Sequence, residues 1–212
     1  MHGMAKREAK QHGLLFHLLD VLFNIIVIVA IVAGIRTFIV SPFQVEGSSM
    51  VDTLQDKEYI IINKLTYYLG QPKRGDVVVF NPPSDHDKFY VKRIIGEPGD
   101  EVIIQDGDVF LKKNGETQIH QLEEPYLNDR NSGNTFRHPP SSGDKSKVVY
   151  DVPTDNYFVL GDNRTGSLDS RSFMIDSHPV PFVKTADIKG RVWFIALPIT
   201  KIHALEIPQY GF

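Results

Sequence analysis

Three polar segments contain the residues that could do chemistry. The first includes two adjacent serines, Ser48 and Ser49, whose hydroxyl groups can act as nucleophiles if a nearby base accepts the proton. The second is Lys92, in the middle of the otherwise apolar stretch FYVKRIIG. The third is GDNRTGSLDSR at residues 161–171, in which acidic and basic side chains alternate. These residue types allow nucleophilic catalysis by a serine, with histidine or lysine as the base.

Histidine is the usual base for a serine, and the chain contains eight. The best candidate is His86, which lies in a polar loop between two expected strands. Its neighbours Asp85 and Asp87 could join it in a metal site, but this tripeptide lacks the spaced ligands of a metal-binding helix or loop. We therefore expect a solvated loop here, and neither a metal ion nor another cofactor.

A lysine can act as the base only if its ammonium group loses its proton near neutral pH. The free pKa is about 10.4, and burial in apolar surroundings lowers it because the charged form is disfavoured there. Strand alternation places Lys92 on one face and Arg93 on the other, so one basic residue must share an apolar face. A buried basic catalyst and an outward-pointing Lys92 both fit this pattern.

The charged segment 161–171 directly follows the apolar sequence NYFVL, which is expected to form a strand. Alternating acids and bases predict a rigid loop, held by internal ion pairs and by backbone amides that donate to carboxylates. Rigid polar loops at strand ends often form functional sites. A purely structural turn remains the alternative.

Residues 41–212 are predicted to be mainly β, as an antiparallel β-sheet scaffold. Short runs of β-branched and aromatic residues alternate with turn sequences such as PGD at residues 98–100 and NG at 114–115. The expected strands are 59–62, 77–80, 89–95, 101–104, 109–111, 148–152, 157–160 and 191–196. A short helix is expected at residues 63–69.

The composition changes between about residues 105 and 150. This stretch is polar and rich in turn residues, and it contains few side chains that could fill a core. We therefore predict a hairpin-rich subdomain inserted into the β-scaffold.

An apolar stretch precedes the β-rich part. Residues 21–40 read VLFNIIVIVAIVAGIRTFIV, and a helix of this length, at about 1.5 Å per residue, matches a bilayer core of about 30 Å. We predict one transmembrane anchor over residues 13–40. A cleaved secretory signal is the alternative, but the stretch is longer than a typical signal core and no clear cleavage site follows it.

The charge distribution predicts topology and excludes one class of partner. Basic residues in the 1–12 segment place the amino terminus in the cytoplasm and residues 41–212 on the other side of the membrane. The net charge is −3, with no basic cluster beyond the amino terminus, so we expect no nucleic-acid partner. The chain has no cysteine, which excludes thiol chemistry and disulfides.

In this order, and after one amino-terminal span, the segments resemble those of type I signal peptidases. The matching sequences are VEGSSMVDTL, GDVVVF, YVKRIIGEPGD, GDNRTGSLDSR and IKGRVWF. The resemblance implies an antiparallel β-scaffold with an apolar face resting on the bilayer of a bacterial plasma membrane. It also implies an endopeptidase that removes signal peptides from exported precursor proteins without a cofactor.

The resemblance further implies roles for individual residues. Ser49, directly before Met50, would be the nucleophile and Lys92 the general base, with the Ser167 hydroxyl beside the lysine amine. Two supporting ion pairs would join Asp162 to Arg93 and Asp169 to Arg171. The oxyanion would be bound by the backbone N–H of Ser49, with help from the Ser48 side chain. Two stretches would hold the substrate as an added strand: Phe43, Gln44, Val45 and Glu46 on one side, and Phe89, Tyr90 and Val91 on the other.

Two departures from the family pattern leave other functions open. The family usually has Pro-Thr-Leu after the nucleophile, where this chain has Asp52-Thr53-Leu54, and Gly47 lacks the hydroxyl that some members use in the oxyanion hole. One alternative is therefore a membrane-tethered β-domain that binds a partner protein and catalyses nothing. Another is a self-cleaving Ser/Lys regulator, against which the apolar span and the 161–171 loop argue.

Overall fold

The structure is a computed structural model, and it describes residues 2–51, 53–137 and 147–212. The chain divides into two compact units, Met1–Val40 and Ser41–Phe212. Asp52 therefore lies outside the described residues.

The first unit is one long helix, α1, at His2–Phe38. Within it, Gly13–Phe38 is long and apolar enough to cross a membrane, with a hydropathy of 2.8. The helix ends two residues before the predicted end of the anchor. Pro42 gives a physical reason, because a proline disfavours helical geometry at the residue before it.

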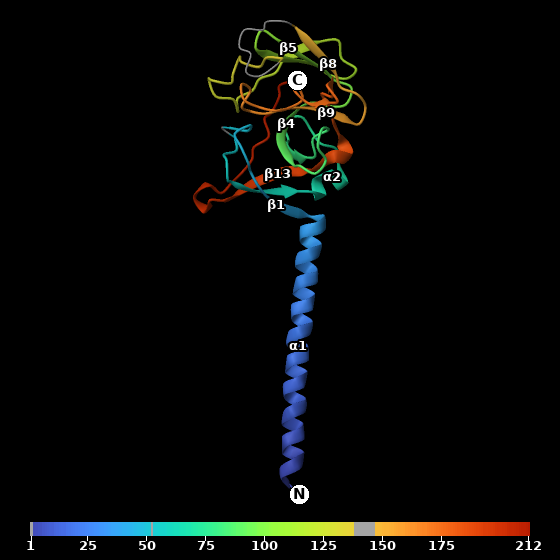
Figure 1. Cartoon of the computed structure of the whole chain (residues 1–212), viewed down its shortest axis with the longest axis vertical. Helices are drawn as coiled ribbons and strands as arrows, with labels where there is room; N and C mark the ends of the chain where they lie inside the picture. The colour runs from blue at the N-terminus through green and yellow to red at the C-terminus, as the bar shows by residue number, and fades with distance from the viewer. Residues whose placement is uncertain (1, 52, 138–146) are drawn as a thin grey trace. The chain divides into compact units, whose positions relative to one another are not determined.

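The second unit is built on an eight-stranded sheet among the described residues, drawn in Figure 1. The strand order is β1-β2-β13-β3-β4-β9-β12, and β14 pairs with β13. The pairs that β13 forms with β2, β3 and β14, and those of β4 with β3 and β9, are antiparallel. The bounds are β1 Val40–Gln44, β2 Tyr59–Asn63, β3 Val77–Phe80, β4 Tyr90–Gly96, β9 Asn156–Leu160, β12 Val183–Lys184, β13 Ile188–Leu197 and β14 His203–Ala204.

A second, four-stranded antiparallel sheet lies between β4 and β9 in the sequence, with the order β7-β6-β5-β8. Its strands are β5 Glu101–Gln105, β6 Asp108–Lys112, β7 Ile119–Gln121 and β8 Val148–Asp151. Asp106 and Gly107 connect β5 to β6 with positive φ angles of 54° and 90°, as a two-residue hairpin turn requires. Val102, Val109 and Leu111 are buried together with residues of β4 and β9, so this sheet shares a core with the scaffold.

Smaller elements complete the fold. They are the helix α2 Leu65–Leu69, the hairpin of β10 Met174–Ile175 and β11 His178–Pro179, and the short helices η1 Thr185–Asp187 and η2 Ile199–Lys201. The buried hydrophobic residues form three clusters, one of which lies beside the Ser48–Ser49 turn.

The prediction of a mainly antiparallel β-fold after one apolar helix is confirmed. The strands β1, β7, β10, β11, β12 and β14 were not predicted. β1 (VSPFQ) begins at the last residue of the apolar stretch and contains a proline, and most of the others are only two residues long. Tertiary pairing, rather than local propensity, decides such short strands.

Candidate active site

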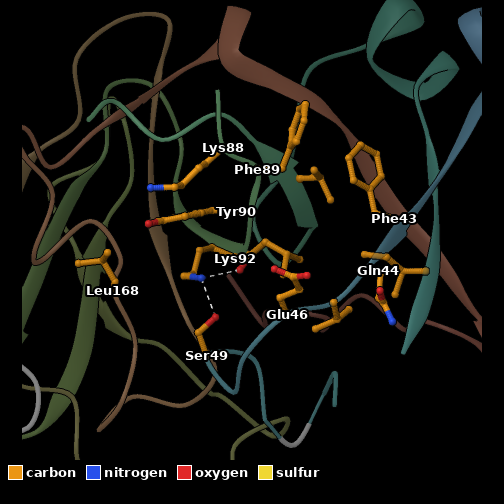
Figure 2. Close-up of a pocket in the computed structure, with 13 residues that line it drawn as sticks. Phe43, Gln44, Glu46, Ser49, Lys88, Phe89, Tyr90, Lys92 and Leu168 are labelled. Atoms are coloured by element: carbon orange, nitrogen blue, oxygen red, sulfur yellow. Dashed lines mark hydrogen bonds between the residues drawn. The ribbon is translucent and has the colours of Figure 1, made fainter. Parts of the chain in front are cut away.

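A groove of about 540 Å³ contains both Ser49 and Lys92. Figure 2 shows these two side chains between Glu46, Gln44 and Phe43 on one side and Leu168 on the other. All seven residues predicted to bind substrate line this groove. The full lining is Phe43, Gln44, Val45, Glu46, Ser49, Ile60, Val79, Lys88, Phe89, Tyr90, Val91, Lys92 and Leu168.

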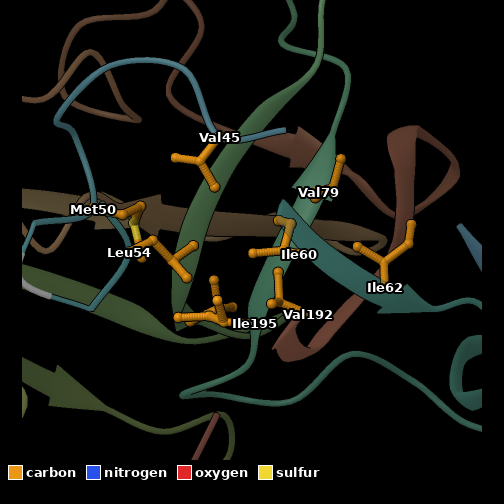
Figure 3. Packing of buried hydrophobic residues seen from close by; sticks show 9 residues of the cluster. Val45, Met50, Leu54, Ile60, Ile62, Val79, Val192 and Ile195 are labelled. Carbon is orange, nitrogen blue, oxygen red and sulfur yellow. The ribbon is translucent and has the colours of Figure 1, made fainter. Parts of the chain in front are cut away.

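Hydrophobic packing fixes the position of Ser49. The next residue, Met50, and Leu54 are almost fully buried against Ile60 and Ile195 in the cluster shown in Figure 3. The Leu54 amide donates to the Met50 carbonyl at 2.8 Å, which closes a tight turn. Ser49 is therefore attached to a rigid core and projects from it into the groove.

Glycine is required just before this turn. Gly47 has φ +88°, a left-handed conformation that costs a residue with a side chain more than it costs glycine. Its amide donates to the Asp56 carboxylate at 2.8 Å, so this N–H already has an acceptor. The Ser49 amide, in contrast, donates to no acceptor among the described residues. Ser48 is exposed, and its carbonyl accepts from the Asn163 side chain at 3.0 Å.

Lys92 lies on β4 and is only 3% exposed. Its Nζ is 2.7 Å from the Ser49 Oγ and 2.8 Å from the Val91 carbonyl oxygen. Burial lowers the pKa of Lys92 from 10.5 to about 8, although the charges of Asp169 and Asp162 oppose this shift. Strand alternation left open whether the Lys92 side chain points outward or shares an apolar face. In the structure it points into the groove.

The 161–171 loop packs against this pair of residues. A Cβ atom at Gly161 would lie 2.1 Å from the Ser167 Oγ and 2.4 Å from the Ser49 carbonyl oxygen, so only glycine fits between them. The backbone N–H of Asn163 donates to the same Ser49 carbonyl at 3.1 Å. The loop and the serine turn are therefore in direct contact.

Ser167 is buried at this contact. Among the described residues its hydroxyl completes no hydrogen bond of good geometry, either with Lys92 or with another group. It lies near the Asp169 carboxylate and contributes to lowering the pKa of that group. The lysine amine forms its hydrogen bonds with the Ser49 hydroxyl and the Val91 carbonyl.

The Arg93–Asp162 pair lies on the opposite side of β4 from Lys92. The Arg93 Nε and Nη2 donate to the two Asp162 oxygens at 3.0 and 2.7 Å, and both side chains are almost completely buried. The Thr53 hydroxyl also donates to Asp162, which connects the serine turn to the loop. Burial alone would lower the pKa of Arg93, but Asp162 raises it above its usual value, so the arginine stays charged.

Asp169 and Arg171 form the second buried pair. Arg171 Nη2 is 2.7 Å from an Asp169 oxygen, and the same oxygen accepts from the Gly161 amide at 3.0 Å. Burial alone would raise the pKa of Asp169, but Arg171 and these hydrogen bonds hold it below its usual value. The loop is thus held by one internal ion pair and by amide-to-carboxylate hydrogen bonds, while Asp162 and Arg164 form ion pairs with residues outside it.

Several residues at the site were not found from the sequence. Thr53 and Asn163 lie inside the segments VEGSSMVDTL and GDNRTGSLDSR, and the available signal was that their side chains can donate hydrogen bonds. Leu168 and Lys88 lie in the groove but carried no signal in their own segments. His86 is exposed, 3.7 Å from Asp187, and does not line the groove.

Comparisons with known proteins identify the family. Residues 18–197 match the family model described as signal peptidase, peptidase S26. The chain is 35% identical over 179 residues to signal peptidase I P of Bacillus subtilis subsp. natto, which covers 84% of this chain and 88% of that protein. It is 38% identical over 182 residues to a signal peptidase I of Bacillus licheniformis, with coverages of 86% and 90%.

The chain therefore belongs to the S26 family of peptidases, within its signal peptidases. The resemblance to type I signal peptidases is confirmed. Among solved structures, a crystal structure of a signal peptidase I from Enterococcus faecalis V583 is similar, with 28% sequence identity and a TM-score of 0.42. That match covers 58% of this chain and 97% of the other.

Proposed function

We propose that the protein is an endopeptidase that removes amino-terminal signal peptides from exported precursor proteins, with Ser49 as nucleophile and Lys92 as general base. The observation that carries this proposal is the 2.7 Å distance between the Ser49 Oγ and the Nζ of a lysine that is 3% exposed. A lysine so buried loses its proton far more readily than a solvated one.

In the proposed reaction, the neutral Lys92 amine accepts the Ser49 proton as the Oγ attacks the carbonyl carbon of the scissile bond. The tetrahedral intermediate collapses when the Lys92 ammonium donates that proton to the leaving amine, which leaves an acyl-enzyme on Ser49. Water, activated by the same amine, then hydrolyses the ester. The Ser49 N–H, with help from the Ser48 side chain, stabilises the oxyanion.

The groove supports binding of the substrate as an extended strand. Phe43–Glu46 and Phe89–Val91 contribute main-chain groups on its two sides, and the rings of Phe43 and Phe89 are 5.2 Å apart in an edge-to-face contact. Small substrate side chains are expected next to the cut, because apolar side chains such as Val45 and Val91 line the groove and would clash with larger ones.

The proposed topology follows from α1. Residues 1–12 lie in the cytoplasm, 13–40 anchor the protein in a bacterial plasma membrane, and 41–212 form the catalytic domain outside, with its inserted segment at about 105–150. The length and hydropathy of Gly13–Phe38 support the anchor. A precursor whose signal segment lies in the same bilayer could then present its cleavage site to the groove.

Ser49→Ala should remove cleavage of a synthetic precursor by the detergent-solubilised full-length protein. The cut is located by product mass, and Ser132→Ala, a change at an exposed serine outside the groove, serves as the control. Cleavage retained by Ser49→Ala would contradict the assigned nucleophile. A wild-type protein that binds the precursor but does not cleave it would favour the partner-binding alternative.

The pH dependence of kcat/KM should report the buried amine. Because Lys92 must be neutral to accept the proton, kcat/KM should rise as the pH increases through about 8 and then level off. The measurement is kcat/KM for one precursor peptide across that range. An ascending limb near the pKa of free lysine would show that Lys92 is solvated and would contradict its proposed role.

A further inference from the structure

Two residues of the inserted segment, Glu124 and Tyr126, contact the arginines beside the active site. Both follow β7 and precede β8, in the polar stretch of the sequence. Glu124 accepts hydrogen bonds from the Nη1 and Nη2 atoms of Arg164, the first at 2.8 Å, and from the Tyr126 hydroxyl at 2.7 Å. The Tyr126 ring lies against Arg93, with 3.8 Å between its centroid and the Arg93 Cζ.

Arg164 connects this contact to the catalytic loop. Its side chain is completely buried, and its Nε donates at 3.1 Å to the carbonyl of Gly161, the residue that lies against Ser49 and Ser167. Arg164 Nη1 also donates to the Thr135 hydroxyl at 2.8 Å. Burial alone would lower the pKa of Arg164, but Glu124 raises it above its usual value, so the guanidinium stays charged.

Arg93 forms the second connection. It binds Asp162 of the same loop, and Asp162 in turn accepts from Thr53 in the serine turn. The ring of Tyr126 covers the guanidinium, an arrangement that stabilises a buried cation. The inserted segment therefore contacts the loop through Arg164 and the far side of β4 through Arg93.

We propose that Glu124 and Tyr126 are positioning residues for the reaction: they hold Arg164 and Arg93 so that the 161–171 loop stays packed against Ser49 and excludes water from Lys92. This inference rests on the proposed function. It gives the inserted segment a role in catalysis, although neither residue lines the groove.

The test uses Glu124→Gln, which keeps the shape of the side chain but removes its charge, and Tyr126→Leu, which removes the ring from Arg93. We expect kcat/KM to fall about 10- to 100-fold, the scale on which small displacements of reacting groups act. The ascending limb of the pH profile should move to higher pH, because a loosened loop admits water to Lys92. Tyr126→Phe, which keeps the ring, should be affected less than Tyr126→Leu.

A matched control separates positioning from folding. Val109→Ala creates a small cavity in the core of the same inserted sheet without changing a polar group. It should lower the melting temperature but leave the pH profile unchanged. If Glu124→Gln lowers only the melting temperature, the proposal fails. An ascending limb of the Glu124→Gln pH profile that moves to lower pH would also overturn the proposal. That shift would mean that the lost Glu124 charge acts on the Lys92 pKa by long-range electrostatics, and not through displacement of the loop.

The Lys92 titration can be followed without a substrate, through the ¹³Cε signal of lysine-labelled full-length protein. If wild-type protein fails to cleave the precursor, the proposed function is wrong, but this signal still tests positioning. A Lys92 titration midpoint that is equal in wild-type protein, Glu124→Gln and Tyr126→Leu would reject the role of both residues.

Discussion

Replacing Lys92 with methionine should abolish precursor cleavage and, near neutral pH, make the protein more stable. Methionine keeps an unbranched apolar side chain in the pocket but has no amine to accept the Ser49 proton. Loss of a residue in a catalytic unit of this kind costs about 10³-fold or more in kcat. Activity and stability should therefore change in opposite directions.

The gain in stability follows from the pKa of Lys92. The folded value of about 8 lies below the ordinary value of 10.5, so the unfolded chain binds more protons between these two pH values. Below pH 8 the folded protein must hold a buried ammonium, a cost of about 3 kcal/mol at about 1.36 kcal/mol per pKa unit. Methionine removes this cost but also loses two hydrogen bonds, worth about 2 kcal/mol together in net terms.

We therefore expect a net gain of about 1 kcal/mol below pH 8, or about 3 °C in melting temperature for a chain of this size. The gain should shrink as the pH rises towards 10.5, where the amine is neutral in both states. The single tryptophan, Trp193 on β13, allows unfolding of the sheet to be followed by fluorescence. Lys92→Arg is the comparison, because guanidinium keeps its charge and should lose activity without any gain in stability.

A Lys92→Met protein that melts at a lower temperature than wild type at every pH would contradict the burial of an ammonium. Residual cleavage above about a thousandth of the wild-type rate would instead contradict the role of Lys92 as base. The two readouts thus test the geometry and the mechanism separately.

The sequence identified Ser49 and Lys92 as candidates because each lies in an unusual local segment, and the family resemblance supplied their proposed roles. Lys92 interrupts an apolar strand, where a basic residue is unexpected on either face, and Ser49 lies in a turn that needs Gly47. The predicted stretches Phe43–Glu46 and Phe89–Val91 also line the groove. Such features depend on neighbours in the sequence, which alternation and turn chemistry describe well.

The contacts that surround these groups depend on pairing across long distances in the sequence. Glu124 and Arg164 are 40 residues apart, and Glu124 lies in a polar stretch where a charged side chain is ordinarily solvated. Composition alone cannot indicate which acidic side chain pairs with which basic side chain. The same limit explains Leu168, which lies in the groove only because the loop after β9 packs against the serine turn.

The second large effect is expected at the buried pair that joins the loop to β4. Asp162→Ala should lower the free energy of unfolding by about 3–5 kcal/mol, because it leaves the buried Arg93 guanidinium without its carboxylate. The double variant Arg93→Met with Asp162→Ala leaves no buried unpaired charge. The double variant should therefore be more stable than Asp162→Ala alone, although it carries one more substitution.

Activity should not follow this recovery of stability. Asp162 also accepts from Thr53, so both variants lose the hydrogen bond that connects the serine turn to the loop. We expect the double variant to fold with nearly wild-type tryptophan fluorescence and still cleave precursor poorly. If it regains full activity along with stability, Asp162 serves folding alone; if it is less stable than Asp162→Ala, the unpaired arginine is not the source of the cost. Melting curves and kcat/KM for the two variants and wild type decide between these outcomes.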